Sequence, residues 1–154
     1  MDATRTSRVP ENLPMTGRLQ RYFGERPEMG LAAVYLFGSH AARRAHRESD
    51  VDLGVLLRWS AKPQRRDRFE VRVRLAGELA RLVAPGEPDV VILNDAPPLL
   101  GRHIVVSGVR IYLADVAADH AYQRDVQLRA ADLAPFLRRM RQLKLDFLDR
   151  RTVS

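Results

Sequence analysis

Four short apolar segments recur along the chain, each about as long as a buried β-strand. They are residues 31–37, 51–57, 89–93 and 109–114. Glycine, proline and charged residues stand between them, which is typical of the turns and loops that separate strands. The pattern therefore predicts four strands.

Helical spacing of apolar residues occupies much of the remaining chain. A short amphipathic helix is expected to end near Gly24, and two prolines after residue 96 predict another helix that runs to Val106. A longer helix is expected between the charged loop 58–64 and the breaker cluster 84–88. Its buried face is predicted to contain Phe69, Val73, Ala76, Leu79 or Ala80, and Val83.

After Asp115 the spacing is helical to the end of the chain. Asp132 is predicted to cap the start of a terminal helix, with Pro135 in its first turn. This helix carries an apolar stripe formed by Leu133, Phe136, Leu137, Met140, Leu143, Phe147 and Leu148. The basic residues around the stripe are Arg138, Arg139, Arg141 and Lys144. We expect the stripe to pack on the domain, with a partner-binding helix as the alternative.

The order of these elements predicts a small α/β (α+β) domain with a helical C-terminal portion. A chain of 154 residues can bury about two-thirds of its unfolded surface in one core, so a second, substrate-binding domain is not expected. We divide the chain into a flexible leader (1–14), a core (15–115) and C-terminal helices packed on the same domain (116–154).

The composition removes several classes of protein. The chain has no cysteine, which excludes disulfides, thiolate metal sites and a nucleophilic cysteine. No apolar segment approaches the roughly 20 residues that cross a bilayer, so no membrane partner is expected. The polar first residues lack the pattern of a secretory signal. These features predict a cytoplasmic protein.

The chain is basic, with a net charge of +7 that is spread along its length. Such an excess suits nucleic acid, a polyphosphate substrate or an acidic protein partner. Nucleic acid is disfavoured, because the basic residues form no clustered motif and have no interleaved aromatic side chains. Charge alone does not decide between the other two.

The segment that carries chemistry is LFGSHAARRAHRESDVDLGVLL, residues 36–57. Gly38 and Ser39 follow one predicted strand, and Asp50 and Asp52 begin the next after ten intervening residues. Because residues two apart in a strand face the same side, both carboxylates are expected to project together. Such a pair favours a cation, and Mg²⁺ is commonly held by one or two carboxylates and substrate phosphates. The backbone N–H groups and the hydroxyl of the Gly-Ser turn would form a phosphate cradle.

Asp89 begins the third predicted strand and is the candidate third carboxylate. It completes a triad with Asp50 and Asp52 if its strand lies beside residues 51–57. Three carboxylates and a phosphate cradle predict metal-dependent attack of a hydroxyl group on a nucleoside triphosphate, with pyrophosphate leaving. Asp50 and Asp52 would share the metal ions, and Asp89 would bind the second ion and accept the proton. Taken singly, each feature also has a plainer interpretation, as an ordinary turn or a surface acid.

The segment resembles the signature of the DNA polymerase β-like nucleotidyltransferases, in which ten residues separate Gly-Ser from Asp-x-Asp. Gly38, Ser39, Asp50 and Asp52 carry the resemblance. The chain looks most like the minimal nucleotidyltransferases, in particular the MntA-type antitoxins of HepT/MntA (HEPN/MNT) toxin–antitoxin systems. Residues 89–115 and the helical C-terminal stretch share this likeness. The resemblance implies a small mixed β-sheet flanked by helices, the nucleotidyltransferase fold.

The resemblance also implies an activity and a partner. In this family AMP is transferred from ATP, with Mg²⁺, to a tyrosine hydroxyl beside the ribonuclease site of the cognate HEPN (HepT-type) toxin, which silences the toxin. The chain is then expected to form a hetero-oligomer with that toxin. Gly38 and Ser39 take the phosphate-binding positions, while Asp50, Asp52 and Asp89 take the carboxylate positions.

The chain departs from the family beside the phosphate cradle. Many relatives have arginine directly after the serine and glycine a few residues later, whereas this chain has His40 and Arg43. His40 is expected to contact a phosphate more weakly than arginine, because its imidazole is mostly neutral at pH 7. Arg43 and Arg44 are further candidates for phosphate contacts.

Two other functions remain open from the sequence. One is an antitoxin that neutralises its toxin by forming a complex, without turnover. The other is a transferase whose acceptor is a small hydroxyl compound, such as an aminoglycoside. The chain is short for this second function, because such enzymes usually add a substrate domain.

Overall fold

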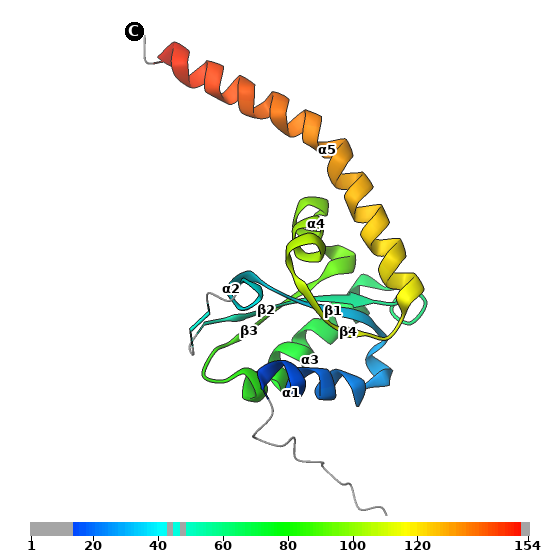
Figure 1. Cartoon of the computed structure of the whole chain (residues 1–154). Coiled ribbons are helices and arrows are strands. Elements are labelled where there is room, and N and C mark those ends of the chain that lie inside the picture. Colours follow the sequence, from blue (N-terminus) through cyan, green and yellow to red (C-terminus); the bar gives the residue numbers. More distant parts are fainter. Residues whose placement is uncertain (1–13, 43–44, 47–48, 152–154) are drawn as a thin grey trace, which may run out of the picture.

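A four-stranded mixed β-sheet forms the centre of the fold (Figure 1). The structure, a computed structural model, describes residues 14–42, 45–46 and 49–151. The strands lie in the order β3-β2-β1-β4, with β2 and β4 antiparallel to β1 and β3 parallel to β2. Their bounds are β1 (Leu31–Phe37), β2 (Val51–Leu57), β3 (Pro88–Ile92) and β4 (Val109–Leu113). The predicted α/β class and the mixed sheet are confirmed.

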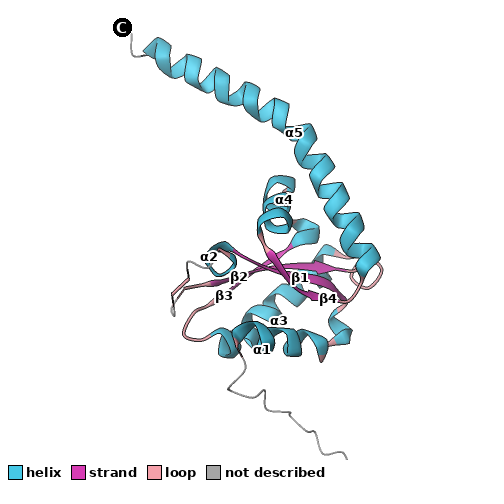
Figure 2. Cartoon of the chain, viewed as in Figure 1, coloured by secondary structure: helices cyan, strands magenta, loops and turns pink. Residues whose placement is uncertain are grey.

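Helices cover both faces of the sheet (Figure 2). On one face lie α1 (Met15–Gly24) and α3 (Arg65–Val83), and on the other lie α4 (Pro98–Ser107) and the first half of α5 (Val116–Arg151). The short elements are η1 (Pro27–Met29), α2 (Gly38–Ala41) and η2 (Leu93–Asp95). In the described part of the chain, no helix has both the length and the apolar character needed to cross a membrane.

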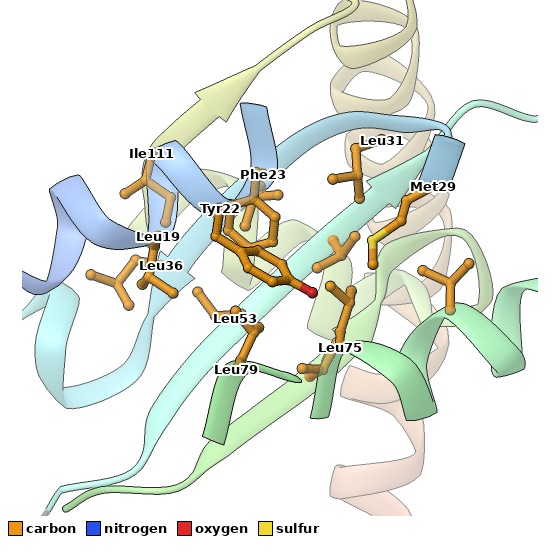
Figure 3. Close-up of a cluster of buried hydrophobic side chains, with 14 of the residues drawn as sticks. Leu19, Tyr22, Phe23, Met29, Leu31, Leu36, Leu53, Leu75, Leu79 and Ile111 are labelled. Carbon is orange, nitrogen blue, oxygen red and sulfur yellow. The ribbon is translucent and has the colours of Figure 1, made fainter. Parts of the chain in front are cut away.

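The central strands are buried on both faces, which is why β1 and β2 read as nearly continuous apolar runs. On the α1/α3 face, Leu53 of β2 belongs to a cluster with Phe23 of α1 and Leu75 and Leu79 of α3 (Figure 3). On the α4 face, glycine in the sheet permits close approach, because a Cβ at Gly54 would lie 2.7 Å from the Ile104 side chain.

A buried polar network fastens the start of α5 to the sheet. The hydroxyl of Tyr35 in β1 donates to the fully buried carboxylate of Asp119, at 2.5 Å. Arg110 of β4 donates to the same carboxylate at 2.8 Å, and Gln123 does so at 2.9 Å. The network satisfies a charge that would otherwise be costly to bury.

The predicted buried face of α3 is wrong as far as Ala76. Phe69 and Val73 are 59% and 56% exposed, and Ala76 is exposed as well. The helix buries Arg68, Val71, Leu75, Leu79 and Val83, so only the last two belong to the predicted face. Two apolar stripes at helical spacing share Leu79 and Val83, and the one that continues through Leu75 and Val71 faces the sheet. Arg68 can join this face because its guanidinium pairs with Asp95.

The predicted helix start at Asp132 is also wrong, because α5 is one helix of 36 residues with Pro135 inside it. Proline removes one backbone hydrogen bond and crowds the preceding turn, which can bend a helix without ending it. In Figure 1 the helix changes direction where its colour turns from yellow to orange. Beyond this region the described side chains are exposed rather than packed on the sheet.

Candidate active site

The register of the sheet brings the candidate site residues to one edge. Phe37, the last residue of β1, pairs with Asp52 of β2, and Asp52 pairs in turn with Asp89 of β3. Gly38 directly follows Phe37, so the Gly-Ser turn and two carboxylates meet at neighbouring strand ends. β3 lies beside β2, as the triad requires.

Strand alternation sets the direction of these carboxylates. Val51 and Val90 are buried in the core on the α1/α3 face. Asp52 directly follows Val51 and Asp89 directly precedes Val90, so both aspartates lie on the opposite, α4 face. Asp50 stands just before β2. Asp52 is partly buried, whereas Asp50 and Asp89 are exposed. The cluster is therefore open to solvent and to an incoming substrate.

Gly38 allows the turn to lie directly against Asp52. Its φ of +70° is in the left-handed region, which favours glycine. A Cβ at this position would lie 2.1 Å from Oδ2 of Asp52, closer than atoms can approach without displacement. The motif therefore needs glycine here for its backbone conformation and for its contact with the carboxylate.

Asp52 is the electrostatic centre of the cluster. Partial burial raises the pKa of its carboxyl group, and the negative charges of Asp89 and Asp50 raise it further, while His40 lowers it. Asp89 and Asp50 are therefore each close enough to Asp52 for their charges to act on its carboxylate. A cation bound among them would relieve this repulsion.

The residues after Gly38 extend the site along α2. Ser39 is partly buried in the first turn of this short helix. Nε2 of His40 lies 3.4 Å from the carbonyl oxygen of Ser49, a contact in which the ring nitrogen is the donor. This contact links α2 to the residue before Asp50. The proposed phosphate ligand Arg43 lies outside the described residues.

The donor set of the cluster fits a hard divalent cation, because carboxylate oxygens are the ligands that Mg²⁺ prefers. Among the described residues, no three histidine, aspartate or glutamate side chains already stand in the arrangement of a metal site. The carboxylates thus form an open cluster of neighbours, in which the exposed side chains of Asp50 and Asp89 would have to turn towards Asp52.

Two polar anchors near β3 are not predicted by the sequence patterns. The side chain of Asn94 makes hydrogen bonds with both backbone groups of Leu57, at 2.9 and 2.8 Å. Arg68 makes two hydrogen bonds to the carboxylate of Asp95, at 2.8 and 2.9 Å. Both anchors hold the chain that follows Asp89. The sequence signal that could have identified Arg68 is its spacing, because it is in phase with the apolar residues Val71 and Leu75 on the buried face of α3.

A separate cavity of about 380 Å³ lies at the other end of β2. Leu56, Trp59 and Tyr122 are among its lining residues, and the buried hydroxyl of Tyr122 has no hydrogen-bond partner within the described part of the chain. At about 3.3 Å per strand residue, Leu56 is roughly 13 Å along β2 from Asp52. The cavity is therefore distinct from the carboxylate cluster.

Residues 18–117 match the family described as polymerase beta, nucleotidyltransferase. The chain belongs to this family. The match spans the whole sheet and includes all three candidate carboxylates. A comparison with curated proteins finds no match.

Solved structures of the same fold come from toxin–antitoxin complexes. A toxin–antitoxin crystal structure with AMP-PNP contains a chain that is 23% identical, with a TM-score of 0.56, over 83% of this nucleotidyltransferase and 95% of that chain. A structure of a tri-AMPylated Shewanella oneidensis HEPN toxin in complex with MNT antitoxin contains a chain that is 20% identical, with a TM-score of 0.53, over 86% of this chain and 98% of that chain. A crystal structure of the toxin–antitoxin MntA-HepT contains a chain that is also 20% identical, with a TM-score of 0.52, over 87% of this chain and 96% of that chain. At these identities the likeness establishes a shared fold.

Proposed function

We propose that this nucleotidyltransferase is an antitoxin that transfers AMP from ATP to a tyrosine hydroxyl of a HEPN (HepT-type) ribonuclease toxin and so neutralises it. The observation that carries the proposal is the position of Asp52, which lies against Gly38 and is paired with Asp89. Family membership supports nucleotidyl transfer. The similar structures with AMP-PNP and with a tri-AMPylated HEPN toxin support ATP as the substrate and a toxin as the acceptor.

In this proposal the turn after β1 holds the triphosphate. Backbone N–H groups at Gly38 and Ser39 and the Ser39 hydroxyl would donate to phosphate oxygens. His40 and Arg43 would add contacts from α2 and the residues after it. Without a Cβ at Gly38, the triphosphate can approach the edge at which Asp52 lies.

The carboxylates would hold Mg²⁺ and assist the transfer. Asp50, Asp52 and Asp89 are the proposed ligands, and bound Mg²⁺ would offset phosphate charge and lower the pKa of the acceptor hydroxyl. The tyrosine oxygen forms a bond to the α-phosphorus of ATP while the bond from that phosphorus to pyrophosphate breaks. Asp89 accepts the tyrosine proton, and its exposed position leaves it accessible to a second protein.

The proposal is tested by adding ATP and Mg²⁺ to the purified protein with its co-expressed HEPN toxin and measuring AMP on the toxin by mass spectrometry. Asp50→Asn and Asp52→Asn are expected to abolish the added mass. Glu70→Gln, on an exposed part of α3, is the matched control and should label the toxin like wild type. Labelling at the wild-type level by both aspartate variants would show that the site is assigned wrongly.

Neutralisation by binding alone is the second candidate, and the exposed apolar half of α5 favours it. Under this alternative, the Asp50→Asn and Asp52→Asn variants still protect cells, and toxin purified from the complex carries no AMP. If expression of the protein made cells that lack a toxin resistant to an aminoglycoside, this result would instead indicate transfer to a small hydroxyl compound.

A further inference from the structure

The second half of α5 projects away from the rest of the molecule (Figure 1). In the described part of the helix, Ala130 is the last buried residue and Ala134 the last partly buried one. Residues 135–151 continue as helix for about 25 Å at 1.5 Å per residue. Most of the stability of helices in proteins comes from packing of an apolar face rather than from intrinsic propensity.

One side of the projecting segment is apolar. At about 100° per residue, seven large apolar side chains fall within an arc of about 140°, and Leu145 lies outside it. We call this face the docking stripe; it consists of Leu133, Phe136, Leu137, Met140, Leu143, Phe147 and Leu148. The exposed fractions of these residues run from 36% for Leu133 to 59% for Phe136. An amphipathic helix normally buries a face of this width, and a contiguous exposed patch of this kind marks an interaction surface.

Basic side chains border the docking stripe. Arg139 and Arg150 lie along one edge and Arg141 along the other, while Lys144 falls within the stripe itself. The acidic residues of the segment, Asp146 and Asp149, lie outside the stripe, towards the opposite side. Residues 133–151 contain six basic and two acidic side chains, a net charge of +4.

We propose that the docking stripe binds a protein partner through an apolar groove rimmed by aspartate and glutamate side chains. Contacts with Phe136, Met140 and Leu143 would form the dry centre, and the arginines would pair with the acidic rim and guide the encounter. We identify this partner with the HEPN toxin, and that identification rests on the proposed function.

Two other occupants fit the charges less well. A second copy of the chain would bring Arg139 and Arg141 against the same basic borders, while Asp146 and Asp149 face away from the contact. On a lipid surface the middle of the apolar face lies deepest among the acyl chains, where the Lys144 ammonium group would have no acceptor. In a protein groove, one carboxylate can pair with it.

The experiment compares two glutamate substitutions on the same helix. Met140 lies at the centre of the docking stripe and is 50% exposed, while Leu145 lies outside it, about 140° round the helix from Met140, and is 49% exposed. Met140→Glu should weaken binding to the co-expressed HEPN toxin by about tenfold or more, and Leu145→Glu should leave it unchanged. Binding is measured on the full chain by titration and by light scattering after gel filtration. Circular dichroism establishes that both variants keep the helix.

The charged border has a test of its own. Wild-type affinity should fall as salt is raised, and the double variant Arg139→Gln, Arg141→Gln should bind more weakly and with a flatter salt dependence. An affinity of Met140→Glu equal to that of wild type overturns the inference. So does wild-type protein that self-associates through this face, or that binds vesicles of anionic lipid through Met140.

The two proposals can fail separately in this experiment. Each sample is also assayed for AMP on the toxin. If wild type binds through Met140 but adds no AMP, docking holds and AMP transfer is refuted. If Met140→Glu binds and labels like wild type, AMP transfer holds and docking by the stripe is refuted.

Discussion

At the scale of single residues, we expect replacement of glycine by alanine to change the free energy of unfolding in opposite directions at Gly38 and Gly77. A Cβ at Gly38 would collide with Asp52, whereas one at Gly77 in α3 meets nothing within 4 Å. Gly38→Ala should lower the free energy of unfolding by about 1–2 kcal/mol, because alanine disfavours a positive φ. Gly77→Ala should raise it by about 0.5–1 kcal/mol through helix propensity. Urea unfolding measures both, and an undiminished stability of Gly38→Ala would contradict the close contact with Asp52.

A second residue-scale prediction concerns acid stability. Partial burial alone would raise the pKa of Glu78, but hydrogen bonds from Tyr22 and Arg74 outweigh it and bring the pKa below its ordinary value of 4.5. The unfolded chain therefore binds this proton more readily, so the contribution to stability is present above about pH 4.5 and is lost as the pH falls below it. Glu78→Gln should reduce the dependence of the unfolding free energy on pH in this range. Urea titrations from pH 6 to pH 3 measure the slope, and Glu70→Gln, which leaves the Tyr22 contact intact, should retain it.

The sequence predicts which carboxylates gather at the site but not which charged residues enter the core. Asp50, Asp52 and Asp89 can be found because each is tied to a strand start that local patterning reveals. Asp119 gives no such signal, because its partner Tyr35 lies 84 residues away. A buried charge whose partners come from distant elements reads as a surface charge until the fold is known.

At the scale of elements, α3 shows that periodicity identifies a helix more reliably than it identifies its buried face. Leu75 is fully buried, whereas Val73, predicted to be buried, is exposed. Leu75→Ala should lower the free energy of unfolding by about 2–5 kcal/mol through lost burial and a residual cavity. Val73→Ala should change it by about 0.5 kcal/mol or less. Equal losses in denaturant titrations would show that the face is assigned wrongly.

α5 shows a different limit at the same scale. Asp132 and Pro135 form a good local signal for the start of a helix, yet the preceding turns are already helical because Val126 and Ala130 pack against the body of the domain. Tertiary contacts before the signal thus override it. The apolar stripe beyond it is at the predicted residues, but sequence patterning cannot distinguish a face that meets the domain from one that meets another molecule.

At the scale of the whole molecule, the order of elements predicts the class of fold because apolar strand segments and helical spacing alternate along the chain. The strand order β3-β2-β1-β4 is not written in that alternation. It follows from which strands pair, and this pairing places Asp52 between the Gly-Ser turn and Asp89. The resemblance to the nucleotidyltransferases predicts the mixed sheet, whereas the positions of the candidate site residues follow from the register of its strands.

The projecting half of α5 has a kinetic consequence. It would hold a partner on one part of the molecule while the carboxylates act on another, so that a docked acceptor is confined near the site at an effective concentration on the order of millimolar. Under both proposals, transfer would be a first-order event within one particle, at a rate that does not change on dilution of the assembled complex. An isolated tyrosine peptide, lacking a groove for the helix, would react only by chance collision.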